Sequence, residues 1–107
     1  MKEEQKRELE EKLLGIAGDS VEFPENVSES LIKFGHLLEY DVMQVPGGTS
    51  RLYMDQQENQ NIRVVSGFAL MEDNVWHSHA WLVLDNCGYK IIDNINALKY
   101  FGVVMPY

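Results

Sequence analysis

The chain is poor in cysteine and in positive charge. Among its 107 residues Cys87 is the only cysteine, which excludes an intrachain disulfide and favours a reducing, cytoplasmic location. Nine lysines and arginines stand against 17 aspartates and glutamates, a formal net charge of −8. A chain this acidic repels phosphate backbones, so we expect no general nucleic-acid binding, and a protein or peptide partner would be a basic one.

Long apolar runs are missing as well. No stretch approaches the roughly 18 residues that a membrane-spanning helix needs, and the charged residues 1–12 have no apolar region of the kind found in secretion signals. No phosphate-binding GK[ST] or GxGxxG motif occurs, so the Gly47–Gly48 pair predicts a plain turn. The length and the hydrophobic fraction of 45% predict one domain, residues 1–107, with a core of its own.

The apolar pattern predicts an α+β domain, with helices first and strands after. A surface helix is expected over residues 1–18, where a narrow apolar stripe includes Leu9 and Leu13. A helical part is expected over residues 26–60, beginning with a helix capped by Asn26. One face of that helix, which we expect to be core, carries Val27, Leu31, Phe34 and Leu38.

From residue 61 the apolar period changes to alternation. Strands are predicted over 61–71, 75–84 and 89–93, and a fourth would fit 101–105. We expect residues 61–107 to form a small antiparallel sheet of three to four strands, with the N-terminal helices packed on it.

The stretch WHSHAW, residues 76–81, carries two of the three histidines. His77, His79 and Trp81 share one face of the predicted strand because side chains alternate along a strand. A hairpin turn at residues 86–87 would place residue 79 opposite residue 94, and a shift of one residue would place His79 opposite Asp93.

A histidine beside a carboxylate is the base half of a nucleophilic triad, because the carboxylate fixes the imidazole tautomer and stabilises the imidazolium. The alternative is a His–Asp hydrogen bond that only satisfies two polar groups. A zinc site would need four ligands, and the pair His77 and His79 with Cys87 does not make that set, although Asp93 and His36 could in principle join it. We therefore expect no metal and no other cofactor.

Three short motifs resemble the C-terminal half of a transglutaminase-like domain, which belongs to the papain-like cysteine-protease superfamily. RVVSGFAL at 63–70 is similar to that family's Arg-x-x-x-Gly-Tyr-type strand, HAW at 79–81 to its His-Ala-Trp, and IID at 91–93 to its aspartate strand. The resemblance covers about residues 61–104, and the ending YFGV at 100–103 is similar to small bacterial and phage-type relatives.

The resemblance implies a reduced papain-like core, with His79 as the base and Asp93 as its orienter. It also implies a substrate or partner cleft, to which we assign Trp81, His77 and Arg63. His77 has a simpler interpretation as a polar residue at the end of its strand.

The family's nucleophile is a cysteine at the start of a helix upstream of the arginine strand, and no cysteine precedes Cys87 here. The corresponding helix start, GGTSR at 47–51, offers Thr49 or Ser50. A hydroxyl is far less acidic than a thiol, so Ser50 would be a poor substitute, and as a helix N-cap its hydroxyl would already be bonded. The family's usual Pro-Thr after the aspartate is also replaced, by Asn94 and Ile95.

Three functions follow. The first, which we favour, is a degenerate transglutaminase-like domain that binds or regulates a protein or peptide partner without catalysis. The second is a small acyl-transfer hydrolase or transamidase with Ser50 as nucleophile and a His79–Asp93 pair. The third is a free-standing acidic interaction or inhibitor protein, in which HSHAW is structural.

Overall fold

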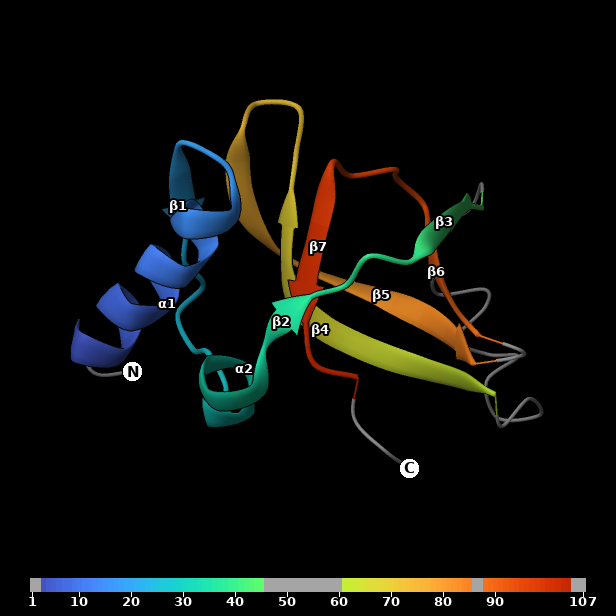
Figure 1. Cartoon of the computed structure of the whole chain (residues 1–107), viewed down its shortest axis with the longest axis horizontal. Helices are drawn as coiled ribbons and strands as arrows, with labels where there is room; N and C mark the ends of the chain where they lie inside the picture. The colour runs from blue at the N-terminus through green and yellow to red at the C-terminus, as the bar shows by residue number, and fades with distance from the viewer. Residues whose placement is uncertain (1–2, 46–60, 86–87, 105–107) are drawn as a thin grey trace.

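The computed structural model describes residues 3–45, 61–85 and 88–104, and its mixed helices and strands agree with the predicted α+β class (Figure 1). The elements in chain order are α1 (Glu3–Ile16), β1 (Ser20–Glu22), α2 (Glu29–Phe34), β2 (His36–Leu37), β3 (Asp41–Gln44), β4 (Ile62–Leu70), β5 (Val75–Asp85), β6 (Tyr89–Asp93) and β7 (Lys99–Gly102).

The described strands form a seven-stranded sheet in the order β2-β7-β4-β5-β6-β3, and β1 pairs with β5 away from this path. The pairs β1–β5 and β3–β6 are parallel, and the others are antiparallel. The prediction of three to four antiparallel strands was therefore wrong in size and in two pairings. Strands β1, β2 and β3 have three, two and four residues, too few to leave an alternating pattern in the sequence.

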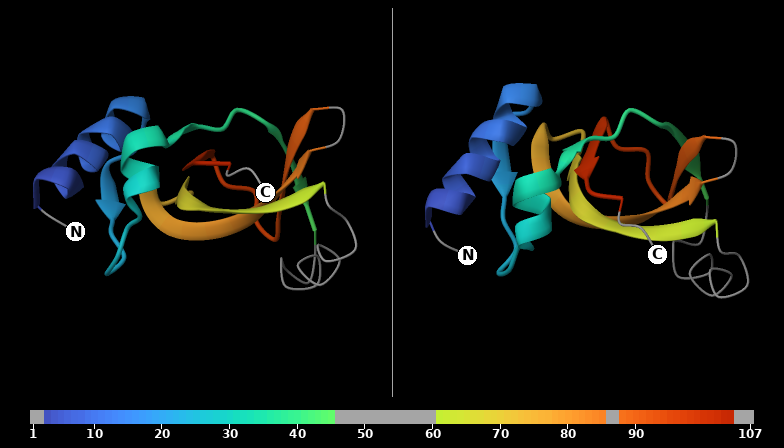
Figure 2. Two further views of the ribbon diagram at one scale, coloured as in Figure 1. Left: turned by 90° about the horizontal axis from the view of Figure 1, so that it is seen from below. Right: turned by 60° about the horizontal axis from the view of Figure 1, so that its bottom comes forward.

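The sheet is strongly curved (Figure 2). Apolar side chains pack on both of its sides. On the side of the two helices, Phe68 and Leu70 of β4 pack in one buried cluster with Leu9 and Leu13 of α1. On the concave side a second cluster is covered by the segment that runs from β2 to β3. Its buried members are Leu38, Val65, Ala69, Trp81, Val83, Ile91 and Tyr100.

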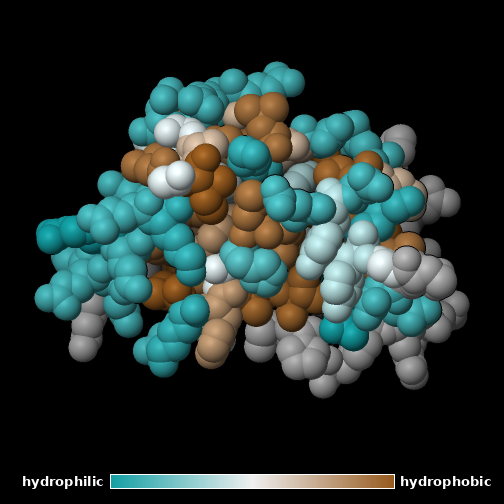
Figure 3. Space-filling view, viewed as in Figure 1, coloured by the Kyte–Doolittle hydropathy of each residue, from teal (hydrophilic) through white to brown (hydrophobic). Residues whose placement is uncertain are grey.

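Helix α1 confirms the predicted N-terminal surface helix. Only Leu9 and Leu13 of its 14 residues are buried, and its outer surface is hydrophilic where it forms the left side of the view in Figure 3. It has 14 residues, and none of the described helices is long and apolar enough to cross a membrane.

The predicted helical part over 26–60 is largely wrong where the structure describes it. Helix α2 covers only Glu29–Phe34, and its N-cap is Ser28, whose hydroxyl accepts from Leu31 N at 3.3 Å, where Asn26 was expected. The helix ends at its C-cap Gly35, whose backbone N–H donates to Leu31 O at 2.9 Å and where a Cβ atom would collide with the ring of Phe101. Strand β2 follows and pairs with β7.

As a result, the residues of the apolar face predicted for that helix do not lie together in one core. Phe34 is 66% exposed and is not core, whereas Leu38 is buried in the concave-side cluster. The rest of the predicted helical part, residues 46–60, lies outside the described residues.

Candidate functional site

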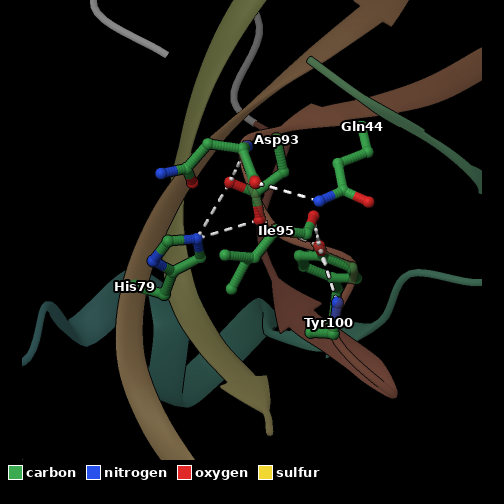
Figure 4. A network of polar contacts seen from close by, with 7 residues as sticks. Gln44, His79, Asp93, Ile95 and Tyr100 are labelled. Atoms are coloured by element: carbon green, nitrogen blue, oxygen red, sulfur yellow. Dashed lines mark hydrogen bonds and ion pairs between the residues drawn. The ribbon is translucent and has the colours of Figure 1, made fainter. Parts of the chain in front are cut away.

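The candidate site centres on a contact between β5 and β6. His79 Nε2 lies 2.9 Å from Asp93 Oδ2 and 3.1 Å from Oδ1 (Figure 4). The side chain of Asp93 is fully buried, and that of His79 is 23% exposed. The predicted His79–Asp93 contact is therefore present, with the carboxylate inside and the imidazole at the surface.

The hairpin register brings these two side chains to one face. Asp85 pairs with Tyr89, so three residues separate β5 from β6, and Leu82 pairs with Ile92. The predicted two-residue turn would have put residue 79 on the opposite face from residue 93. The third loop residue is Gly88, whose φ of 116° suits glycine, and it moves the register by one residue.

Besides His79, one further hydrogen-bond donor contacts each carboxylate oxygen of Asp93. The backbone N–H of Asn94 donates to Oδ1 at 2.8 Å, and the Tyr100 hydroxyl donates to Oδ2 at 2.8 Å. Three donors can satisfy a buried carboxylate, and a hydrogen bond to an ionised group is stronger than a neutral one.

Tyr100 was not predicted as a site residue. It lies on β7 and is buried, and burial raises its pKa above the ordinary tyrosine value, with the hydrogen bond to Asp93 adding to the rise. The phenol is therefore a neutral donor at ordinary pH. No sequence signal marked it, because the contact with Asp93 depends on how the segment 94–98 folds back.

The hydrogen bond to Asp93 determines which ring nitrogen of His79 can interact with a bound molecule. In a neutral imidazole one nitrogen carries the proton, and here Nε2–H is the donor that the carboxylate requires. Nδ1 then carries the lone pair, and Figure 4 shows that nitrogen turned away from Asp93. The arrangement can accept a proton or a hydrogen bond at Nδ1.

The indole ring of Trp81 stacks against the imidazole ring of His79. The two rings are stacked, with centroids 5.9 Å apart and planes 26° apart, and Trp81 also makes an edge contact with Tyr100 at 5.0 Å. Trp81 is only 1% exposed, so it forms part of the floor of the site. Its Nε1 is buried and has no hydrogen-bond partner among the described residues.

His77 belongs to a separate ion-pair cluster. Its Nδ1 lies 3.0 Å from Glu22 on β1, and its Nε2 lies 2.8 Å from Asp73 in the β4–β5 turn. The hydrogen bond from His77 lowers the pKa of Asp73. His77 thus fastens β1 to the turn, which agrees with the interpretation of a polar residue at a strand end.

Arg63 lies away from the His79–Asp93 pair. It pairs with Val83 in the sheet, whereas His79 pairs with Gly67, four residues or about 13 Å farther along β4. Its guanidinium forms an ion pair with Asp85 at 3.2 Å. Arg63 and its ion pair therefore lie toward the other end of the strands from His79, and its assignment to a cleft stays a prediction.

The candidate nucleophiles Ser50 and Thr49 lie outside the described residues, as does Cys87. Within the described part of the chain, no hydroxyl or thiol makes a hydrogen bond with His79. The described neighbours of Cys87 are Asp85 and Gly88, and Asp85 is six residues, about 20 Å, along β5 from His79.

A cavity of about 430 Å³ adjoins the network on the segment that follows β6. The Gln44 side chain, which lines it, donates to Asn94 O at 3.3 Å, and Ile95, which also lines it, has its carbonyl 3.2 Å from Tyr100 Oη. His79 is not among the lining residues, so the cavity lies beside the pair. It is lined by Gln44, Met71, Glu72, Asp73, Ile95, Asn96 and Ala97.

The histidine, cysteine and acidic residues that the structure describes form no group of three that could hold a metal ion. Comparison of the chain with protein-family models, with curated proteins and with solved structures found no match in any of the three.

Proposed function

We propose that this chain is a transglutaminase-like domain that binds a protein or peptide partner at the His79–Asp93 site and does not carry out acyl transfer. The observation that carries the proposal is the 2.9 Å contact between His79 Nε2 and a fully buried carboxylate oxygen. It orients the imidazole and leaves Nδ1 as an outward acceptor, which suits hydrogen bonding to a donor on a bound peptide.

The order of the motif residues on the sheet supports the family assignment. Arg63, His79 and Asp93 lie on the successive strands β4, β5 and β6, and the family motifs that they resemble follow the same order. The antiparallel pairs β4–β5 and β5–β6 join these strands directly.

The place of Cys87 in the sequence supports binding rather than catalysis. Acyl transfer by a thiol requires the thiolate within hydrogen-bond reach of its base, about 3 Å. Cys87 follows the end of β5, and the preceding described residue, Asp85, is about 20 Å along the strand from His79. A cysteine mechanism with His79 as the base is therefore not supported.

Charge and shape beside the pair support a basic partner. Glu72 and Asp73 line the 430 Å³ cavity, together with the apolar Met71, Ile95 and Ala97. Lysine and arginine side chains match such a lining, because an apolar stem carries a charged head. The net charge of −8 would also attract a basic partner over a longer range.

A titration of the ¹⁵N-labelled protein tests binding. A lysine-rich peptide should shift the amide signals of residues 71–73 and 95–97 and the ring signals of His79, and a glutamate-rich peptide should not. Glu72→Gln should weaken binding severalfold at low salt, whereas Glu10→Gln on α1, the same change in charge, should have little effect. Absence of lysine-peptide binding, or an equal loss in both variants, would contradict a basic partner at this site.

A probe experiment separates binding from acyl transfer. The wild type, Ser50→Ala and His79→Ala are treated with a serine-reactive fluorophosphonate and with a thiol-reactive probe. We expect no stoichiometric serine labelling and only ordinary thiol reactivity. Labelling of Ser50 that is lost in His79→Ala would assign the chain to the acyl-transfer alternative.

A further inference from the structure

We propose that Tyr100 is a positioning residue, whose hydroxyl fixes the carboxylate of Asp93 so that His79 presents Nδ1 outward. The inference extends the proposed function, since it rests on His79 as the group that meets the partner. The Tyr100 hydroxyl lies 2.8 Å from Asp93 Oδ2, and both side chains are buried.

The carboxylate needs such a second support. Rotation of an aspartate carboxylate about its Cβ–Cγ bond is only weakly restricted by itself. Asn94 N–H holds Oδ1 at 2.8 Å and the Tyr100 hydroxyl holds Oδ2 at 2.8 Å. His79 Nε2 then faces both oxygens, at 3.1 and 2.9 Å, and this depends on both being held.

The hydroxyl proton of Tyr100 is directed at Asp93. Ile95 O is its other acceptor, but it lies at 3.2 Å and is neutral, whereas the carboxylate oxygen is closer and charged. Ala97 N–H donates to the Tyr100 oxygen at 3.3 Å, and Trp81 packs against the Tyr100 ring at 5.0 Å. The phenol is therefore held at its oxygen and at its ring.

Removal of the hydroxyl should release one oxygen of the carboxylate. Among the described residues, His79 would then be the remaining partner of Oδ2. The carboxylate could turn about the Asn94 contact, and the preference of His79 for the Nε2–H tautomer would weaken. A purely structural tyrosine would affect the free energy of unfolding but not this tautomer preference.

The test is ¹⁵N NMR of the histidine ring nitrogens at about pH 9, where an ordinary imidazole is neutral. Tyr100→Phe should lower the ratio of Nε2–H to Nδ1–H tautomers of His79 by roughly two- to tenfold, the range for loss of one hydrogen bond. Tyr40→Phe is the matched control, because the Tyr40 ring packs against the same concave-side cluster but, among the described residues, its hydroxyl makes no hydrogen bond with Asp93. An unchanged ratio in folded Tyr100→Phe would overturn the proposal.

Two further measurements keep the test decisive if Tyr100→Phe does not fold. In the wild type, the Tyr100 hydroxyl proton should exchange slowly with water and show a nuclear Overhauser contact with the His79 Nε2 proton, and its absence would overturn the proposal. 4-Aminophenylalanine at position 100 keeps a donor and should retain the wild-type ratio. Peptide binding is measured separately, so failure of the proposed partner leaves the tautomer result to decide the role of Tyr100.

Discussion

His79 and Asp93 meet at 2.9 Å although they are not opposite each other in the sheet. The last paired residues before them are Leu82 and Ile92, and continuing that register would set residue 81 opposite residue 93. The contact is therefore a diagonal one on the concave face, a distance that a long imidazole can bridge. It joins the last residue of β6 to the middle of β5, where Trp81 supports the ring.

Substitution of Asp93 should show how strongly this contact stabilises the fold. Asp93→Ala leaves the donors of His79, Asn94 and Tyr100 without their acceptor, and each unsatisfied buried group costs about 1–3 kcal/mol. Some of that cost is relieved by water at the partly exposed His79, so we expect a loss of about 2–4 kcal/mol in the free energy of unfolding. Urea titration measures it.

Two variants act as controls for Asp93→Ala. Asp93→Asn keeps one acceptor oxygen and the side-chain shape, so it should cost less, about 1–2 kcal/mol. Asp41→Asn changes an exposed aspartate of β3 and should stay within about 0.5 kcal/mol of the wild type. An Asp93→Ala variant as stable as Asp41→Asn would show that the network contributes nothing to stability.

Gly67, the sheet partner of His79, should tolerate no side chain. A Cβ atom there would lie 2.1 Å from Phe101 O and 2.9 Å from Gly102 Cα, and backbone atoms cannot move aside. Gly67→Ala should therefore destabilise the protein by about 3 kcal/mol or more. Gly15→Ala near the end of α1 meets no atom within 4 Å and should be neutral or stabilising by up to about 1 kcal/mol. Equal denaturation midpoints for the two variants would contradict the close packing of β4 on β7.

The parts of this fold that could be predicted are those with a repeated local pattern. The alternation in β4, β5 and β6 is long enough to define the strands, and β6 was predicted at residues 89–93. The parallel pairings of β1 and β3 connect distant segments and leave no local signal. The spacing of Leu31 and Leu38 looked helical, yet the helix ends at Gly35 and the two leucines lie in separate cores.

The candidate site was predictable only as a pair of residues. His79 and Asp93 follow from the motifs, but their common face depends on a three-residue loop ending at Gly88, and one residue fewer would have separated them. Tyr100 could not be inferred, because its contact requires β7 to return beside β4. Arg63 was grouped with His79 by motif alone, and its ion pair with Asp85 lies at the other end of the strands.

Metal removal should leave the protein unchanged. His79 Nε2 is bonded to Asp93, which leaves only Nδ1 of that ring as a possible metal ligand. Both ring nitrogens of His77 already face carboxylates. A tight zinc site needs three or four such ligands. Dialysis against a chelator should therefore leave the thermal midpoint where it was. One equivalent of zinc in the purified protein, lost in His77→Ala, would show that a site forms.

Alkaline pH should destabilise the protein through Tyr100. Burial raises the pKa of this phenol above its ordinary value of 10.0, so the native state keeps the proton after the unfolded chain has begun to lose it. The stabilisation is thus fully present below pH 10.0 and is lost as the pH rises from there toward the native pKa. Urea midpoints of the wild type should therefore fall as the pH rises above about 10.

Tyr100→Phe identifies the group responsible for that decrease. The variant has no phenol at this position, so its stability should be lower than the wild type at neutral pH and should decline less steeply above pH 10.0. The pKa of Tyr40 is also raised by burial, but Tyr40 is less buried, so Tyr40→Phe should reduce the slope by a smaller amount. If the wild type and Tyr100→Phe lose stability in parallel through this range, the hydroxyl of Tyr100 does not keep its proton in the native state, and it could not act as the neutral donor to Asp93 there.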